Sequence, residues 1–188
     1  MKWTPYVLMA ATLVSVAASN AQSQQADTAS MSAAAKAKLI KSALSAAPAN
    51  VAANATVALP GAGGQMTVLR QGTNGFTCIP DAPDSNGVDP MCIDEEGMKW
   101  AHSWMAHEAK PGNTAPGLVY MLAGGSDISA TDPWAAKTDH WITSPPHWMI
   151  LWPFDGAATG LPTTPKKTGT WIMWAGTPYA HLMVNQVP

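Results

Sequence analysis

Two stretches of this chain place apolar residues at helical spacing. Residues 30–47 read SMSAAAKAKLIKSALSAA, with an apolar stripe made of Leu39, Ile40, Ala43, Leu44 and Ala47. This period predicts an amphipathic helix that ends at Pro48. A second helix is expected to begin after Asp94, a favourable N-cap residue, and to end at Pro111-Gly112. Its predicted apolar arc consists of Met98, Ala101, Trp104 and Met105.

Short β-strands are predicted where apolar and polar residues alternate, or where an apolar run is bounded by turn residues. Residues 66–70 and 76–79 flank the turn-rich segment Gly72–Gly75, a pattern that predicts a β-hairpin. Further strands are expected at 117–123 and 147–152, and a closing hairpin at 171–184. About six short strands joined mostly by loops, with two helices, indicate a single α+β domain whose mainly antiparallel sheet is covered by the helices.

The closing segment, WIMWAGTPYAHLMV, is predicted to be apolar on both faces. With a turn centred on Gly176-Thr177, Trp174 falls opposite Tyr179 and Ile172 opposite His181. One face then carries Ile172, Trp174, Tyr179, His181 and Met183. Because a strand pair with two apolar faces is normally buried on both sides, this hairpin and the strand at 147–152 are expected to form the centre of the sheet.

The first 21 residues have the pattern of a secretory signal peptide. A basic start at Lys2 precedes an apolar run over residues 7–18 and the small-x-small ending Ser19-Asn20-Ala21. Cleavage near Ala21 is expected to leave a secreted or periplasmic chain without a transmembrane segment. Residues 22–29, which are polar and aperiodic, then form a flexible tail, and residues 30–188 form the single domain.

Charge and cysteine content narrow the class of protein. The formal net charge is −2 and only 12% of the residues are charged, which argues against a nucleic-acid partner because such binding needs a basic face. Cys78 and Cys92 are the two cysteines, an even pair suited to a disulfide in an exported chain. Such a bridge closes a loop of roughly 15 residues, worth about 3 kcal/mol in the chain-entropy model.

Two short segments of similar sequence carry the clearest candidate for metal chemistry. Both PHWM and AHLM separate a histidine from a methionine by one residue, in the pairs His147–Met149 and His181–Met183. In a strand, such residues project from the same face. An imidazole and a thioether from each of two neighbouring strands would suit copper, above all Cu(I). The sequence therefore offers copper binding as one alternative to a protein without a cofactor.

Two further alternatives use other residues. Ser126 and Asp127 follow a predicted strand, and together with a histidine they offer a hydrolase with a Ser/His or Asp/His site, although the Gly-x-Ser-x-Gly elbow is absent. The abundance of tryptophan, with nine residues, instead favours a surface for a small ligand or a protein partner. The residues proposed for that surface are Trp134, Trp141, Trp148 and Tyr179.

Several segments together resemble a family of small exported bacterial proteins to which no function is assigned. They are GTNGFTCIPD, DPMCIDEEGMKW, YMLAGGSD, TDPWA, SPPHWMI and MWAGTPYAHLM. The resemblance covers about residues 42–184 and implies export and a single domain, but it supplies no activity or catalytic residue. The leading interpretation is therefore a non-catalytic exported binding or structural module.

Overall fold

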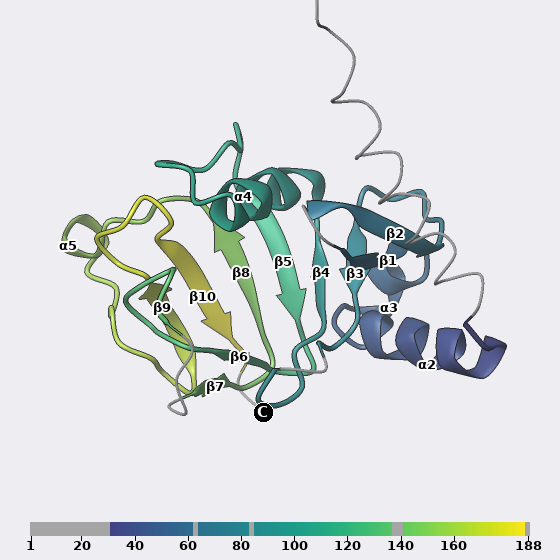
Figure 1. Ribbon diagram of the computed structural model, residues 1–188. Helices are drawn as coiled ribbons and strands as arrows, with labels where there is room; N and C mark the ends of the chain where they lie inside the picture. Colours follow the sequence, from purple (N-terminus) through teal and green to yellow (C-terminus); the bar gives the residue numbers. More distant parts are fainter. Residues whose placement is uncertain (1–30, 62–63, 83–84, 137–140, 187–188) are drawn as a thin grey trace, which may run out of the picture. The chain divides into compact units, whose positions relative to one another are not determined.

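A mixed but mainly antiparallel sheet of eight strands is the framework of this protein (Figure 1). The computed structural model describes residues 31–61, 64–82, 85–136 and 141–186. The strand order is β2-β1-β3-β4-β5-β8-β10-β9. The strands are β1 (Thr56–Pro60), β2 (Met66–Arg70), β3 (Thr77–Ile79), β4 (Met91–Ile93), β5 (Gly117–Met121), β8 (His147–Leu151), β9 (Gly169–Met173) and β10 (His181–Asn185).

A second sheet of two strands and four helices complete the described elements. The small sheet pairs β6 (Gly125–Asp127) with β7 (Ile142–Ser144). The helices are α2 (Ala33–Leu44), α3 (Ala49–Ala52), α4 (Glu95–Met105) and α5 (Gly156–Thr159). The α+β class and the mainly antiparallel sheet are therefore confirmed, whereas the main sheet has eight strands instead of about six. The predicted signal peptide and the tail at 22–29 lie outside the described residues.

The predicted hairpin between residues 66–70 and 76–79 is wrong, because β1 lies between these two strands. β1 pairs antiparallel with β2 and parallel with β3, where Thr56 lies opposite Thr77. The connection after β2 passes directly over the start of β1. A Cβ atom at Gly72 would lie 2.1 Å from the backbone nitrogen of Thr56, so the close passage requires glycine.

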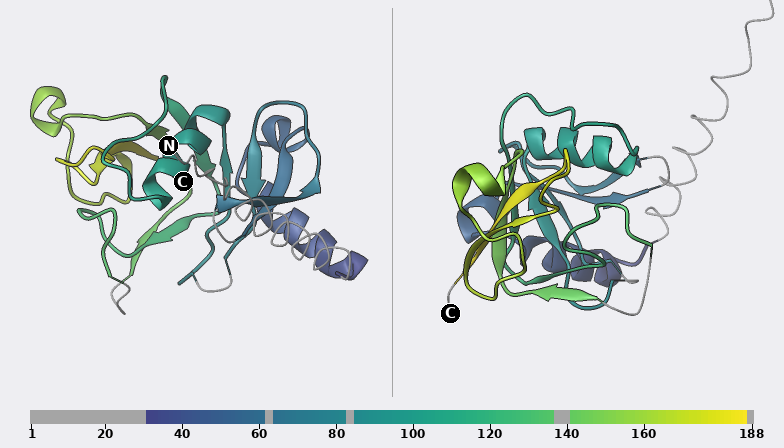
Figure 2. Two further views of the ribbon diagram at one scale, coloured as in Figure 1. Left: turned by 45° about the horizontal axis from the view of Figure 1, so that its top comes forward. Right: turned by 90° about the vertical axis from the view of Figure 1, so that its left-hand side faces the viewer.

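Two apolar clusters lie on opposite faces of the main sheet. Cys92 and Ile93 are successive strand residues and so point to opposite sides. Cys92 belongs to the cluster beneath α2, with Ala43 and Val57, whereas Ile93 belongs to the cluster beneath α4, with Trp100. Figure 2 shows α4 and α2 on different sides of the strands. The two helices predicted to cover the sheet thus cover different faces.

Helix α4 is held close to the sheet by two glycines. Its N-cap residue, Asp94, accepts a hydrogen bond from the Gly97 backbone N–H at 2.7 Å, as the sequence predicts. A Cβ atom at Gly117 of β5 would lie 2.5 Å from the Cα of Gly97, so the helix packs directly against the strand backbone. This contact brings the first half of α4 close to β5.

The predicted end and apolar arc of this helix need correction. The helix ends at Met105, well before Pro111, and His107 follows in the left-handed region with φ 54°. Trp100, which the predicted arc omits, is only 5% exposed, whereas Met105 is 50% exposed. The close contact at Gly97 rotates the helix so that Trp100 faces the core.

The closing hairpin forms, but its register differs by one residue from the predicted one. His181 lies opposite Met173, and Met183 lies opposite Trp171. The connecting residues 174–180 make a longer turn than predicted, in which the Trp174 backbone N–H donates to the Ala130 carbonyl at 2.8 Å. Because side chains alternate between faces, this slip places Trp171 and Met173, and not Ile172, on the face of His181.

Candidate functional site

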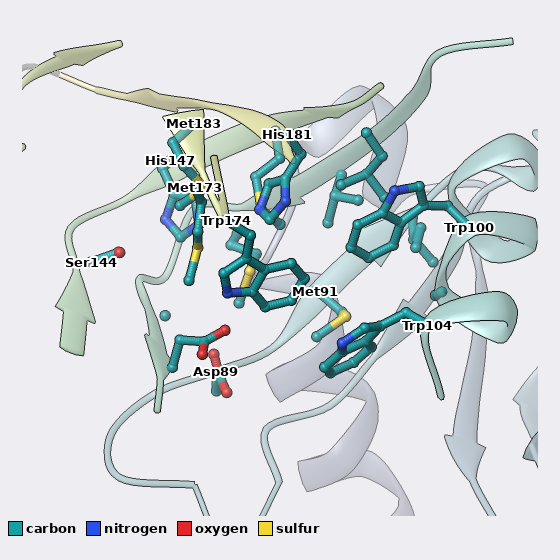
Figure 3. A pocket seen from close by; sticks show the side chains of 18 of the residues that line it. Asp89, Met91, Trp100, Trp104, Ser144, His147, Met173, Trp174, His181 and Met183 are labelled. Carbon is teal, nitrogen blue, oxygen red and sulfur yellow. The ribbon is translucent and has the colours of Figure 1, made fainter. Parts of the chain in front are cut away.

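A cavity of about 190 Å³, partly open to solvent, lies between the main sheet, α4 and β6 (Figure 3). Five methionines and two histidines from the sheet line it: Met91, Met121, Met149, Met173, Met183, His147 and His181. Indole rings from Trp100, Trp104 and Trp174 form a second part of the lining. Asp89, Ser126, Asp127 and Ser144 supply the polar groups.

The strand register explains why the two His-x-Met segments meet in this cavity. β8 and β10 are antiparallel neighbours in which Met149 lies directly opposite Met183. His147 and His181 are each two residues away from one of these methionines and therefore share their face. The structure thus brings together all four residues of the predicted copper site.

Both histidines have the same local hydrogen bond. The Nδ1 atom of His147 lies 2.8 Å from the carbonyl oxygen of Pro145, and that of His181 lies 3.0 Å from the carbonyl oxygen of Tyr179. A carbonyl only accepts, so Nδ1 carries the proton and Nε2 keeps its lone pair. Neither Nε2 has a hydrogen-bond partner among the described residues. Each imidazole is therefore oriented by its own turn, with a free nitrogen donor.

Burial keeps both imidazoles neutral near pH 7. His147 is 2% exposed and His181 is 3% exposed. Burial, which disfavours the charged form, lowers the pKa of His181 to about 4 and also lowers the pKa of His147. A neutral imidazole with a free lone pair is the state in which histidine binds metals.

Aromatic rings surround His181 on its other sides. The ring centroid of Trp174 lies 5.0 Å from that of His181, and the ring centroid of Trp100 lies at 5.5 Å, both in edge-to-face contact. The two indoles stack on each other with centroids 5.9 Å apart. The Trp174 Nε1–H donates to the Ser129 carbonyl at 2.8 Å, which fixes this ring in the loop after β9. The aromatic wall is therefore rigidly held next to one histidine.

A carboxyl group lies close to the other histidine. A Cβ atom at Gly125 would lie 3.0 Å from His147 Cε1, 2.9 Å from Met121 Cε and 3.3 Å from Asp89 Oδ1. The side chains of His147, Met121 and Asp89 therefore all lie next to Gly125, where a larger residue would collide with them. Burial raises the pKa of Asp89 to about 6, and the nearby carboxylates of Asp81 and Asp127 add to this effect.

The serine proposed for the hydrolase alternative bonds to this same carboxyl group. The Ser126 backbone N–H donates to Asp89 Oδ1 at 3.0 Å, and its hydroxyl donates to Oδ2 at 3.5 Å. Activation of a serine nucleophile would require a hydrogen bond from Ser126 to a histidine. The described ranges contain no such bond. Asp127 lies in the same wall, with a pKa raised by burial. The hydrolase stays a prediction.

We expect the variant Asp89→Asn to be more stable than the natural chain at pH 7.5. The raised pKa means that the folded state binds a proton more tightly than the unfolded state, so the cost of ionised Asp89 to folding is absent below pH 3.8, grows between pH 3.8 and about 6, and is fully present above about 6. Asparagine removes this cost at pH 7.5, which amounts to about 1 to 2 kcal/mol because the carboxyl group is partly exposed and solvent screens its charge, and it has little effect below pH 4. Urea unfolding at both pH values measures the difference, and an equal effect at both would contradict this origin.

The four aromatic residues predicted to form a partner surface do not share one exposed face, although Trp134 and Tyr179 are in edge-to-face contact with ring centroids 5.3 Å apart. Trp134 is 38% exposed and stacks on His107 with centroids 5.1 Å apart. Trp141 lines a second cavity of about 240 Å³, and Trp148 points away from the first cavity because it follows His147 in β8. Tyr179 is fully buried, with its hydroxyl donating to the Glu108 carbonyl at 2.9 Å, so its assignment to a surface is wrong.

The sequence interpretation does not assign several of the cavity residues to a site. Met91, Met121 and Met173 each lie in a short strand, and their period-2 spacing from Ile93, Val119 and Trp171 is a signal that could place them on a buried face. Nothing local marks Asp89, because it belongs to a connection whose path depends on distant contacts. The sequence does place Trp174 on the face of His181, whereas the contacts that hold its indole against that ring are distant in sequence.

Comparison with protein-family models, with curated proteins and with solved structures finds no match for this chain. In the described part of the chain, no group of three or more His, Cys, Asp or Glu residues is placed to hold a metal ion, and no helix is long and apolar enough to cross a membrane. Fold and site therefore define an α+β protein with a cavity of imidazole, thioether and indole groups.

Proposed function

We propose that this chain is an exported protein that binds Cu(I) in the cavity lined by methionine and histidine. The observation that carries the proposal is that two neutral imidazoles with free Nε2 atoms share one cavity with five thioethers. Thioethers are soft ligands and imidazole is a good copper ligand, so this set favours Cu(I) over Zn²⁺ or Mg²⁺.

The location of the protein fits the same proposal. The chain begins with a segment typical of a signal peptide, and Cys78 and Cys92 form a disulfide bond, as predicted. Disulfides persist in oxidising compartments outside the cytosol. Because both cysteines are used in this bond, thioethers supply the sulfur ligands of the proposed site. We infer a secreted or periplasmic protein without catalytic activity.

The cavity also favours a second candidate, a small apolar ligand. Its volume of about 190 Å³ is larger than the cavity of about 150 Å³ that binds benzene in an engineered protein. The indole rings of Trp100, Trp104 and Trp174 would contact such a ligand. This candidate needs no free imidazole nitrogen, so the two proposals differ in their dependence on the histidines.

An anaerobic titration of the purified mature chain with Cu(I), in competition with a colorimetric chelator, tests the metal proposal. We expect His147→Ala combined with His181→Ala to weaken Cu(I) binding at least 100-fold. Met149→Leu combined with Met183→Leu removes two thioethers with little change in volume, and we expect a loss of at least tenfold. Zn(II) is expected to bind far more weakly to the natural chain.

The matched control changes the exposed histidines of the same chain. His102 and His107 lie outside the cavity, and His107 has φ 54°, so His102→Ala combined with His107→Asn removes two imidazoles without backbone strain. Cu(I) affinity should not change in this control. Equal affinity in the natural chain and in both cavity variants would overturn the proposal and leave the apolar ligand as the remaining candidate.

A further inference from the structure

We infer that the cavity binds two Cu(I) ions, each held by one histidine and two methionines. This inference rests on the proposed function and adds the number and composition of the sites. The first set is His147, Met121 and Met149. The second set is His181, Met173 and Met183. The two sets are referred to below as the His147 set and the His181 set.

The sheet register gives each histidine two thioether neighbours, and it places Met149 of one set directly opposite Met183 of the other, so the two sets adjoin. His147 lies directly opposite Met121 of β5, and Met149 is the next residue on the same face of β8. His181 lies directly opposite Met173 of β9, with Met183 next on the same face of β10. Directly opposed residues have Cβ atoms about 5 Å apart, within reach of a shared ion for side chains of this length.

The two histidines occupy different positions along the sheet, although their rings still interact electrostatically. His147 lies opposite Asn185, which is four residues from His181 on β10. At about 3.4 Å per residue, their backbone positions are separated by about 14 Å along the strand. Each ring is also tied through Nδ1 to a carbonyl of its own turn, at Pro145 and Tyr179, which prevents a swing toward a common centre. The two rings stand apart in Figure 3.

The surroundings of the two sets differ in a way that an experiment can detect. Asp89 Oδ1 converges with Met121 and His147 around Gly125, so a carboxylate can balance the charge of an ion in the His147 set. The His181 set instead lies against the indoles of Trp174 and Trp100. A cation near an indole face interacts with its π-electrons, so an ion in the His181 set should quench tryptophan fluorescence.

The test counts Cu(I) ions per chain under anaerobic conditions and records tryptophan fluorescence in the same titration. We expect the natural chain to bind two ions with unequal affinity, because two like charges in one cavity repel. Met121→Leu combined with Met149→Leu should bind one ion and retain the quenching. Met173→Leu combined with Met183→Leu should bind one ion and lose most of the quenching.

Met98→Leu serves as the control, because Met98 packs against the same core without lining the cavity. It should bind two ions. Circular dichroism establishes that each variant is folded.

A single ion in the natural chain, bound more weakly by both double variants, would overturn the two-site inference and leave Cu(I) binding intact. Two ions retained in either double variant would also overturn it. No Cu(I) binding by the natural chain would overturn the proposed function and the inference together.

Discussion

Replacing Trp100 by alanine is expected to lower the free energy of unfolding by about 4 kcal/mol, in the range found for large aromatic residues removed from a core. Trp100 is only 5% exposed and packs from α4 into the apolar cluster on the sheet. Its ring centroid lies 5.9 Å from that of Trp174, 5.3 Å from that of Tyr179 and 5.5 Å from that of His181. Alanine leaves a void that the close contact of α4 with β5 prevents from closing.

Trp100→Phe is the matched variant. The indole N–H of Trp100 is buried and has no hydrogen-bond partner among the described residues, so phenylalanine removes an unsatisfied polar group while it keeps an aromatic ring. We expect it to cost less than about 1.5 kcal/mol. Urea unfolding followed by far-ultraviolet circular dichroism measures both values. Equal costs for the two variants would show that the stacked rings do not anchor α4.

The sequence predicts the helices and most long strands because their signals are local. Most of the apolar stripe at 30–47 lies in α2, which ends at Leu44 and not at the predicted Pro48, and the cap at Asp94 lies at the start of α4. The strand β1 is missed because its sequence ends in Pro60, a residue that is disfavoured in sheets, and because its insertion between β2 and β3 depends on the close passage at Gly72. Strand order is thus set by contacts between distant residues.

The candidate site, like the fold, is predicted only in part from local sequence patterns. Strand alternation alone predicts that His147 and Met149 share a face, as do His181 and Met183, and the structure places all four in one cavity. The neighbours Met121 and Met173 require the register, which the sequence places one residue away in the closing hairpin. That register depends on the Trp174 loop, whose backbone and indole N–H groups bond to Ala130 and Ser129. No local pattern contains this information.

Removing the disulfide is expected to lower the free energy of unfolding by about 3 kcal/mol, because the bridge restricts the unfolded chain. Cys78 and Cys92 lie directly opposite each other in β3 and β4, are fully buried, and are separated by 14 residues. We propose the double variant Cys78→Ala and Cys92→Ala, which avoids a buried free thiol. Urea unfolding of this variant measures the loss, and the natural chain after reduction is its control, with a similar expected stability.

The same variant separates the stability of the fold from the chemistry of the cavity. Cys92 points to the α2 side of the sheet, whereas its neighbour Met91 points into the cavity. Because the bridge acts mainly on the unfolded state, the folded variant should keep the Cu(I) affinity of the natural chain at temperatures well below its unfolding transition. Weaker Cu(I) binding by the fully folded variant would instead mean that the bridge holds β4 in the position that the site requires.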